Sequence, residues 1–464
     1  MRAPKKLAIL VGGGPAPGIN SVISAATIRA RLEGIDVLGV QDGFSGLMRG
    51  DISHVQELDM DNVSRIHFRG GSYLGTARDN PTKDPKHLET TVTSLLRLDV
   101  DKLISIGGDD TAFSAMNIEK ASQGRLHVVH VPKTIDNDLD LPHGIPTFGY
   151  QTARHVGVNI VQNLMVDAKT THRWFFVVSM GRKAGHLALG IGKAAGATLT
   201  LVPEEFPGDK IRLKHLVDIL VGAIIKRLSY GRQDGVAVLA EGLMERLDPD
   251  DLTSLKDVER DAHGHIRLAE VNFGAVLKQQ VRQRLKEMNL NITIVDKNIG
   301  YELRCADPIP FDMEYTRDLG FCAAQFILTG GNAAMVSIQE GRFVPMYFKD
   351  IIDPVTKKTK VRMVDVASES FFIARRYMLR LNEVDFEDPH EMAKYAAICG
   401  MSVDKFEKEF AYLLEEDNLY RLPKNNSIKG TAKESNQVYV KSSAKKGAKA
   451  PAEKGAESDA DGTE

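Results

Sequence analysis

Cysteine is scarce in this chain of 464 residues, which holds three, Cys305, Cys322 and Cys399, and no Cys-x-x-Cys pair. So small, odd and scattered a set excludes a disulfide framework and a zinc site built on cysteine pairs. It also fits a reducing compartment, and we therefore expect a cytoplasmic protein.

Long apolar runs are lacking as well. No stretch of about 18 uncharged apolar residues occurs, so we expect no transmembrane helix. The run Leu7–Val11 near the start is too short for the core of a signal peptide. The 60 basic and 62 acidic residues nearly cancel, which gives no reason to expect binding to nucleic acid or to a membrane.

The chain has the composition of a globular protein, with 43% apolar and 26% charged residues. Its length is sufficient for two or three domains. The tail that begins near Ser442 is the exception, because it has no aromatic residue and few apolar ones. Such a segment cannot bury enough apolar surface to offset its ordering entropy, so we predict that residues 442–464 are disordered.

A short apolar run, a glycine-rich turn and a helical stretch follow one another three times. These units are Lys6–Val11, Gly12–Gly18 and Asn20–Leu32; Lys102–Ile106, Gly107–Thr111 and Ala112–Ala121; and Trp174–Val178, Ser179–Gly185 and His186–Ala195. Further predicted strands are Val128–Val131, Thr198–Val202, Gly235–Ala240, Ile292–Val295 and Ala334–Ile338, and further helices are His215–Leu228, Phe273–Met288 and Thr316–Leu328. Asn20 and Ser21 are candidate caps of the first helix.

Strands that alternate with helices indicate parallel sheets covered on both faces. So many strand–helix units would overfill one sheet, so we predict two α/β domains.

The three glycine-rich turns share one place in this scheme, the carboxyl ends of strands, where open α/β sheets bind their ligands. Glycine lets backbone N–H groups approach a phosphate, and a following helix adds a favourable dipole. For Gly12–Gly14 alone, a tight turn without a ligand explains the residues equally well. The turn matches neither Gly-x-Gly-x-x-Gly nor the P-loop pattern, which disfavours ordinary dinucleotide and P-loop sites.

Two adjacent carboxylates, Asp109 and Asp110, directly follow Gly107 and Gly108 at a strand end. A helix N-cap with a dipole-stabilised acid explains one of them more readily than both. The functional interpretation gives Asp109 to Mg²⁺, which takes one or two carboxylates together with phosphate oxygens.

The loop Pro132–Asp138 concentrates one cation, two acids and two neutral polar side chains. A solvated loop can have this composition, but phosphoryl transfer to a hydroxyl needs it. A base must reach that hydroxyl, and cations must offset the charge on the moving group. Asp136 and Lys133 are the candidates for these two roles.

Further polar groups lie next to predicted strands. They are His172-Arg173, Met180-Gly181-Arg182, Glu204-Glu205, Glu241-Gly242 and Tyr301–Arg304. Arginine suits bidentate binding of a phosphate, and carboxylates accept hydrogen bonds from sugar hydroxyls. Taken singly, each group is more often a solvated loop, and His186 is better explained as a structural residue than as a metal ligand.

Over roughly residues 5–420, the order of these motifs resembles the phosphofructokinase family, which phosphorylates the 1-hydroxyl of fructose 6-phosphate. The motifs that carry the resemblance are Gly13–Asn20, Gly75–Arg78, Asp109, Thr134–Asp138, Met180–Arg182, Glu241 and Tyr301–Arg304. The resemblance implies two Rossmann-like three-layer domains with mainly parallel sheets and an active site in the cleft between them. It implies a donor domain at 1–147, completed by about 305–345, and a sugar domain at 148–304, completed by about 346–420.

The resemblance also implies roles for single residues. Asp109 falls on the metal position and Asp136 on that of the general base, with Lys133 and Asp110 as further catalytic candidates. The donor-binding candidates are Gly14, Arg78, Gly108 and Thr111. The substrate-binding candidates are Thr134, Ile135, Asp136, Arg173, Met180, Gly181, Arg182, Glu241, Tyr301, Glu302, Leu303 and Arg304. In many members the arginine at the position of Arg173 reaches the sugar phosphate from a neighbouring subunit, so we expect a homodimer or homotetramer with shared active sites.

Two positions distinguish the phosphoryl donors of this family. ATP-dependent members generally have glycine at the position of Asp110, and many have glycine at that of Lys133. Both departures favour inorganic pyrophosphate. Asp110 would lie where the α-phosphate of ATP extends, and like charges about 4 Å apart cost about 4 kcal/mol at an effective dielectric near 20, roughly a thousandfold in binding.

We therefore predict a Mg²⁺-dependent transferase that uses pyrophosphate to phosphorylate fructose 6-phosphate reversibly, in glycolysis or its reversal. The alternatives are an ATP-dependent member of the same family and a non-catalytic sugar-phosphate-sensing subunit. NAD and lipid kinases also use a Gly-Gly-Asp loop, but they lack the Thr134–Asp138 and Met180–Arg182 motifs.

Overall fold

A computed structural model describes residues 6–142, 144–253, 272–351 and 360–414 of the chain. These residues belong to one compact unit, Met1–Leu419. The segment 442–464, predicted to be disordered, lies outside the described residues. Within the described part, we find no helix whose length and apolar character would let it span a membrane.

The larger sheet has eight strands, in the order β12-β11-β5-β4-β1-β2-β3, with β6 paired to β5. Its strands are β1 (Lys6–Val11), β2 (Val37–Val40), β3 (Val55–Leu58), β4 (Val100–Gly107), β5 (His127–Thr134), β6 (Phe148–Gly149), β11 (Ala334–Gln339) and β12 (Arg342–Tyr347). The central pairs are parallel, and only the outer pairs β2–β3 and β11–β12 are antiparallel. The carboxyl ends of β1, β4 and β5 are therefore neighbours at one edge of the sheet.

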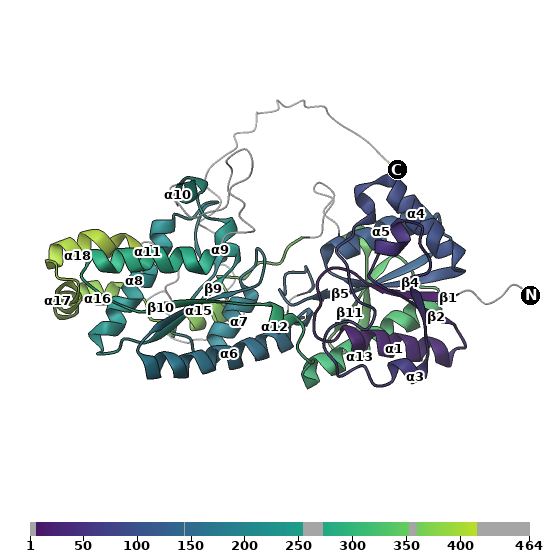
Figure 1. The fold of residues 1–464 in the computed structure, drawn as a ribbon, viewed down its shortest axis with the longest axis horizontal. Helices are drawn as coiled ribbons and strands as arrows, with labels where there is room; N and C mark the ends of the chain where they lie inside the picture. The colour runs from purple at the N-terminus through teal and green to yellow at the C-terminus, as the bar shows by residue number, and fades with distance from the viewer. Residues whose placement is uncertain (1–5, 143, 254–271, 352–359, 415–464) are drawn as a thin grey trace, which may run out of the picture. The chain divides into compact units, whose positions relative to one another are not determined.

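Helices cover both faces of this sheet (Figure 1), with α1 (Ile19–Leu32) and α13 (Pro310–Leu328) on one face and α4 (Pro85–Arg97) and α5 (Asp109–Ser122) on the other. Helix α13 comes from far along the chain. It packs tightly on α1, because a Cβ at Gly320 would lie 2.6 Å from the carbonyl oxygen of Val22.

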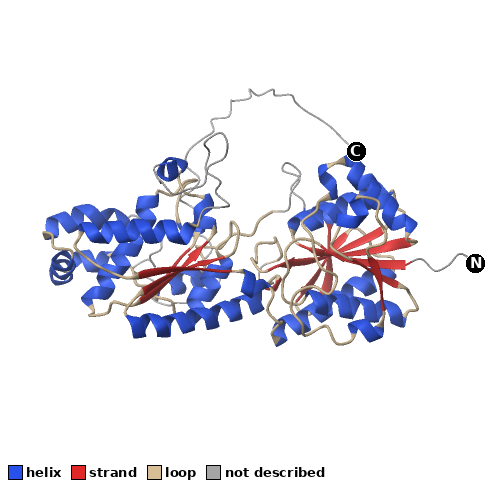
Figure 2. Ribbon diagram, viewed as in Figure 1, coloured by secondary structure: helices blue, strands red, loops and turns tan. Residues whose placement is uncertain are grey.

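The smaller sheet has four strands, all parallel, in the order β10-β7-β9-β8. They are β7 (Trp174–Ser179), β8 (Leu199–Leu201), β9 (Gly235–Ala240) and β10 (Ile294–Ile299). Helices α6 (Tyr150–Thr171) and α7 (His186–Ala195) lie on one face, and α8 (Leu213–Ser229) and α11 (Phe273–Glu287) on the other (Figure 2). The indole of Trp174 fills the space beside Gly235, where a Cβ would lie 2.6 Å from the ring.

The remaining helices are short. They are α2 (Ser45–Met48), α3 (Met60–Val63), α9 (Gly242–Glu245), α10 (Pro249–Thr253), α12 (Tyr301–Arg304), α14 (Phe348–Ile351), α15 (Glu369–Arg376), α16 (Glu383–Glu387), α17 (Pro389–Ile398) and α18 (Val403–Phe410), with 3-10 turns at Pro81–Lys83, Pro203–Glu205 and Ala411–Leu413. The C-terminal helices pack on the smaller sheet's core through buried aromatic residues such as Tyr395, Phe406 and Phe410.

Every predicted strand and helix is present, although several ends differ. The predicted cap of the first helix is wrong. Helix α1 begins at Ile19, and its N-cap is Gly18, whose φ of 104° is left-handed. The side chain of Asn20 instead donates to the carbonyl of Arg69 at 3.0 Å and accepts from the amide of Tyr73 at 2.7 Å, so it holds a loop.

Candidate active site

Side chains at the carboxyl ends of β1, β4 and β5 line a pocket of about 290 Å³. The larger sheet and its turns supply Gly13, Gly14, Pro15, Arg78, Gly108, Asp109, Asp110, Thr111, Lys133, Thr134, Ile135, Asp136, Asp138 and Leu139. Segments that follow strands of the smaller sheet supply Met180, Arg182, Glu241 and Arg304. The fold thus brings most of the predicted site residues to one place.

The turn after β4 is shaped by Thr111, which is 5% exposed. An added Cβ at Gly12 or at Gly107 would lie 2.4 Å from its hydroxyl oxygen, so both positions require glycine. Helix α5 then begins at Asp109 with Gly108 as its N-cap. The positive dipole end of this helix therefore lies beside the pocket, which suits a phosphate.

Lys133 lies at the end of β5 and is 5% exposed. Its ammonium donates a hydrogen bond to the carbonyl of Gly14, which ties β5 to the turn after β1. Burial lowers the pKa of Lys133 to about 8, an effect that Asp136 opposes and neighbouring arginines strengthen. A desolvated cation at this position interacts strongly with any phosphate that enters.

Arg78 belongs to a segment that is joined to the same turn. The amide of Gly13 donates to the carbonyl of Ala77 at 2.8 Å, and the hydroxyl of Thr76 donates to the carbonyl of Gly13 at 2.6 Å. Arg78 is exposed, so it extends over the pocket from a fixed backbone.

Asp136 is 6% exposed, and its amide donates to the hydroxyl of Thr134 at 3.0 Å. One carboxylate oxygen, Oδ2, lies 3.7 Å from Nε of Arg182. The other, Oδ1, is buried and receives no hydrogen bond from any described residue. Burial, and next the charge of Asp138, raise the pKa of Asp136 to about 7. A carboxylate with these properties can accept a proton near neutral pH.

Arg182 lies on the turn after β7 with a left-handed φ of 50°. Partial burial lowers its pKa, but the carboxylates of Asp136, Asp138, Asp109 and Asp110 outweigh that effect, and the pKa is raised. One arginine therefore faces the acidic groups of both the β4 and the β5 turns.

Glu241, which follows β9, is linked to the same turn. Burial raises its pKa, while backbone hydrogen bonds from Gly181 and Arg182 oppose the rise. Gly181 itself is buried, and a Cβ there would lie 2.8 Å from the carbonyl of Ala184. Glu241 thus lines the pocket and also supports the turn that carries Arg182.

The four residues of α12 are divided between several environments. Arg304 lines the pocket, and its guanidinium lies 4.6 Å from the centroid of the Tyr301 ring, which is 71% exposed. Leu303 is buried in the core, and Glu302 accepts from the amide of Gly300 at 3.1 Å. Lys297 of β10 lies 3.7 Å from Glu302.

Arg173 is separated from the pocket. It precedes the six-residue strand β7, whereas Met180 and Arg182 follow that strand. A strand of this length spans about 20 Å, so Arg173 lies at the opposite edge of the smaller sheet from the pocket lining.

Sequence reasoning missed Arg362, which supports the loop after β5 from more than 200 residues away. Its backbone amide donates to the carbonyl of Asp138 at 2.8 Å, and its guanidinium donates to the carbonyls of Asn137 at 3.1 Å and Ile145 at 2.8 Å. Its own carbonyl lies 3.0 Å from Nε2 of His186, which confirms a structural place for that histidine. No local pattern marks Arg362, because its partners are set by the tertiary fold.

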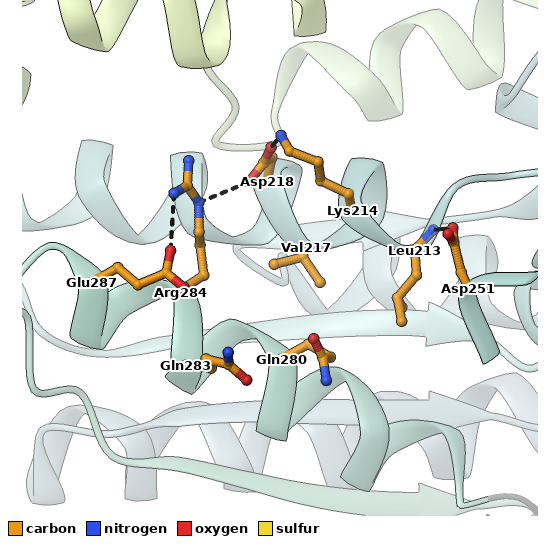
Figure 3. Close-up of a pocket in the computed structure, with 9 residues that line it drawn as sticks. All are labelled: Leu213, Lys214, Val217, Asp218, Asp251, Gln280, Gln283, Arg284 and Glu287. Carbon is orange, nitrogen blue, oxygen red and sulfur yellow. Dashed lines mark hydrogen bonds and ion pairs between the residues drawn. The ribbon is translucent and has the colours of Figure 1, made fainter. Parts of the chain in front are cut away.

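A second pocket of about 300 Å³ lies beside α8 and α11 (Figure 3). Its buried Asp218 is paired with Lys214, with Nε of Arg284 at 3.3 Å and with the hydroxyl of Tyr412 at 2.6 Å. Arg284 also contacts Glu287 at 3.1 Å. These charges satisfy one another and connect the C-terminal helices to α8 and α11, so we assign this pocket a packing role.

Within the described residues, no group of three or more His, Cys, Asp or Glu side chains surrounds a common point. A protein-only cage for a metal is therefore not built there. The pocket instead offers Asp109 beside a helix N-terminus with room for phosphates. This donor set fits Mg²⁺, which is commonly held by one or two carboxylates and by the substrate's phosphate oxygens.

Comparison with known proteins identifies the family. Residues 6–327 match the sequence profile described as Phosphofructokinase, which is more than half of the chain. The chain belongs to the phosphofructokinase family. The expected resemblance is therefore confirmed.

Two relatives are similar over nearly their whole length. The chain is 51% identical over 418 residues to a pyrophosphate–fructose 6-phosphate 1-phosphotransferase of Naegleria fowleri, covering 88% of this chain and 96% of that protein. It is 50% identical over 416 residues to a protein of the same name from Thermotoga maritima, covering 89% and 99%.

The fold also matches solved structures of the family. A pyrophosphate-dependent phosphofructokinase from Nitrosospira multiformis superimposes with a TM-score of 0.61 at 17% identity, covering 86% of this chain and 93% of that one. At such low identity the match concerns the fold alone. It confirms the predicted α/β architecture with two largely parallel sheets.

Proposed function

We propose that this chain is a pyrophosphate-dependent phosphofructokinase, which transfers a phosphoryl group reversibly from pyrophosphate to the 1-hydroxyl of fructose 6-phosphate. The observation that carries the proposal is that Asp110 and Lys133 line the same pocket as Asp136. They are the two positions at which this family's donors differ, and both favour pyrophosphate. The two relatives with about half of their residues in common carry the same activity in their names.

Asp136 acts as the general base in this proposal. Its unpartnered Oδ1 is available to the incoming 1-hydroxyl, and its raised pKa matches proton transfer near neutral pH. Arg182 lies close to Oδ2 and restrains the carboxylate. Accepting the proton makes the sugar oxygen nucleophilic as it approaches the phosphorus in line.

The donor is bound by Gly14, Arg78, Gly108 and Lys133, with Thr111 fixing the turn beneath them. Lys133 and Arg78 offset the charge of the leaving phosphate. Mg²⁺, held by Asp109 and by pyrophosphate oxygens, would supply further charge compensation on the transferring group. Asp110 repels a longer donor, because an α-phosphate would extend toward its carboxylate.

The sugar phosphate is bound by arginine and glutamate side chains from the smaller sheet. Arg182 and Arg304 bind the 6-phosphate, while Glu241 and Met180 contact the sugar, and the backbone of Thr134 and Ile135 lies beside them. The remaining candidates Gly181, Tyr301 and Leu303 support these groups, since each contacts a lining residue or lies beside one in the chain. Glu302 acts one step further away, through the amide of Gly300.

Assembly and location complete the proposal. Arg173 lies a strand's length from its own pocket, which favours a homo-oligomer in which it reaches a neighbouring active site. We divide the chain into a donor domain, 1–147 with 305–345, and a sugar domain, 148–304 with 346–420. The membership of β1–β5 and β11 in the larger sheet and of β7–β10 in the smaller sheet supports this division, whereas β6 pairs with β5 of the larger sheet and β12 crosses the boundary at 345. We place the enzyme in the cytoplasm, where its sugar phosphate substrates occur.

The reverse reaction gives a direct test. Fructose 1,6-bisphosphate, orthophosphate and Mg²⁺ should yield fructose 6-phosphate and pyrophosphate, because pyrophosphate and the sugar ester are close in transfer potential. Formation of pyrophosphate can be followed by ion chromatography. A protein that forms no pyrophosphate, yet phosphorylates fructose 6-phosphate with ATP, would refute the proposal in favour of the ATP-dependent alternative.

A further inference from the structure

A buried polar pair lies beneath the turn that follows β4, and the proposed mechanism does not use it. Ser105 of β4 and His130 of β5 are directly paired in the sheet, and both are 0% exposed. The Ser105 hydroxyl lies 2.9 Å from Nδ1 of His130. The other ring nitrogen, Nε2, lies 3.0 Å from the carbonyl oxygen of Gly107. The histidine therefore joins β5 to the last residue of β4, at the edge of the pocket.

The direction of these hydrogen bonds follows from their chemistry. A carbonyl oxygen only accepts, so Nε2 of His130 must carry the hydrogen that is donated to Gly107. In a neutral ring Nδ1 is then the acceptor, and the Ser105 hydroxyl donates to it. Burial lowers the pKa of His130 to about 3, so the ring remains neutral at physiological pH. Ser105 thus fixes the tautomer that His130 needs for the bond to Gly107.

This bond adds to the sheet pairing of Gly107 with Pro132 in holding the orientation of the peptide unit between Gly107 and Gly108. Because the peptide is trans, its N–H points away from its carbonyl. The carbonyl points toward β5, where His130 lies, so the Gly108 N–H points toward β1 on the other side of β4. Strand β1 leads into the turn that holds Gly13 and Gly14, which line the pocket together with Gly108.

There is a physical reason to restrain the peptide between Gly107 and Gly108 against flipping. Thr111 requires glycine at 107, since a Cβ there would lie 2.4 Å from it. A peptide flanked by two glycines has access to more backbone conformations than any other, including the flipped one in which carbonyl and N–H exchange directions. In the flipped state a carbonyl oxygen would face the phosphate in place of an N–H. The bond from His130 stabilises the orientation that can bind an anion.

We infer that His130 is a positioning residue for the phosphoryl donor, which acts through the Gly107 carbonyl to present the Gly108 N–H to a phosphate oxygen, with Ser105 fixing its tautomer. The inference rests on the proposed function insofar as the donor is pyrophosphate. It deepens that function, because it assigns donor binding to a residue that never touches the donor.

The test compares His130→Leu with His130→Gln and measures KM for each substrate separately. His130→Leu removes the donor to Gly107, so KM for pyrophosphate should rise about tenfold, the equivalent of one lost hydrogen bond to a charged ligand, while KM for fructose 6-phosphate stays within about twofold. His130→Gln keeps an N–H donor at similar reach and should restore KM for pyrophosphate to within about threefold of the wild-type value. Val129→Ala, a buried neighbour in β5, is the control for general loosening of the strand.

A second measurement covers variants that turn over slowly. Calorimetric binding of methylenediphosphonate with Mg²⁺, in the absence of sugar, should weaken in His130→Leu and, by a smaller factor, in Ser105→Ala. Equal rises in both KM values would overturn the inference, and so would a rise in KM for pyrophosphate in Val129→Ala as large as that in His130→Leu. If the wild-type enzyme uses ATP and not pyrophosphate, the proposed function fails. The inference about His130 is then tested separately, by comparing KM for ATP in His130→Leu with that in His130→Gln and Val129→Ala.

Discussion

The two sheets contribute to the pocket in different ways. Three groups from the larger sheet are buried and held in place: Lys133 is 5% exposed, Asp136 6% and Thr111 5%, although Arg78 and Asp110 beside them are exposed. The groups from the smaller sheet are more accessible, and the side chain of Arg182 is 57% exposed. In the proposed mechanism, the groups that handle the proton and the phosphoryl group are therefore the desolvated ones. The arginine that binds the sugar phosphate stays accessible to solvent.

This contrast has a local origin in the backbone. Lys133 and Thr134 end strand β5, so the sheet's hydrogen bonds fix where they point. Arg182 lies on a turn, at a left-handed φ, and depends on Glu241 for support. Substitutions on the donor side should therefore change the chemical step, and substitutions on the sugar side should change binding.

The largest effect is expected for Asp136→Asn. Loss of the general base should lower kcat by about 10²–10⁴-fold while the protein stays folded. The initial rate of fructose 1,6-bisphosphate formation measures it. Asp140→Asn, an exposed neighbour in the same loop, is the matched control and should leave kcat unchanged. Unaltered turnover in Asp136→Asn would show that the base lies elsewhere.

The sugar side is tested by Arg182→Met. A hydrogen bond to a charged group contributes about 1.5–3 kcal/mol, so KM for fructose 6-phosphate should rise by roughly 10–100-fold. KM for pyrophosphate should change less, because the contact proposed for Arg182 is with the 6-phosphate, whereas Asp109 and Asp110 on the donor side act on it through their charge. The exposed neighbour Lys183 provides the control Lys183→Met, which should resemble the wild type. The contrast between the two sheets breaks down if both KM values rise together in Arg182→Met.

Donor choice is tested by Asp110→Gly, which removes both the charge and the side chain. We expect measurable ATP-dependent phosphorylation, at a rate at least about tenfold above that of the wild type, since a like-charge repulsion of several kcal/mol is relieved. Asp110→Asn keeps the size and removes the charge, so the pair separates steric from electrostatic exclusion. No gain of ATP activity in either variant would contradict the role given to Asp110.

The smallest effect concerns pH and stability. The pKa of Asp136 is raised from 3.8 to about 7, so the folded state retains a proton there that the unfolded state has lost. This residue therefore contributes nothing unfavourable at pH 4. Its cost to stability grows as the pH rises from about 4 to about 7 and is constant above that, where both states are ionised. Asp136→Asn should stabilise the protein at pH 8 by on the order of 1–3 kcal/mol, and far less at pH 4.

Urea denaturation at the two pH values measures the difference. In the active enzyme, the same group makes kcat/KM rise as the pH increases through about 7, because only the ionised carboxylate accepts a proton. A stability gain that is equal at both pH values would exclude the buried charge as its cause.

Much of this molecule could be predicted from its sequence. The strands β1 and β9 and the helix α7 have the predicted bounds, because buried parallel strands are continuous apolar runs and their helices have clear apolar spacing. Helix α6 was not predicted, since polar residues interrupt its apolar face. The caps were harder to predict: Gly18 is the N-cap of α1, and the side chain of Asn20 bonds to a loop distant in sequence.

The site could be predicted as far as its residues follow strands. Gly108, Asp109, Lys133, Asp136 and Arg182 do so, and parallel strands bring their carboxyl ends together. Their supporting partners could not be predicted in this way. Arg362 and His130 act through backbone carbonyls, and such contacts depend on the packing of the folded chain and leave no pattern in the sequence.

The most direct test of this account is the choice of donor by the wild-type protein. Purified enzyme with fructose 6-phosphate and Mg²⁺ is supplied with either pyrophosphate or ATP, and the formation of fructose 1,6-bisphosphate is measured for each. The account predicts rapid turnover with pyrophosphate and little or none with ATP. Turnover with ATP that equals or exceeds turnover with pyrophosphate would contradict it.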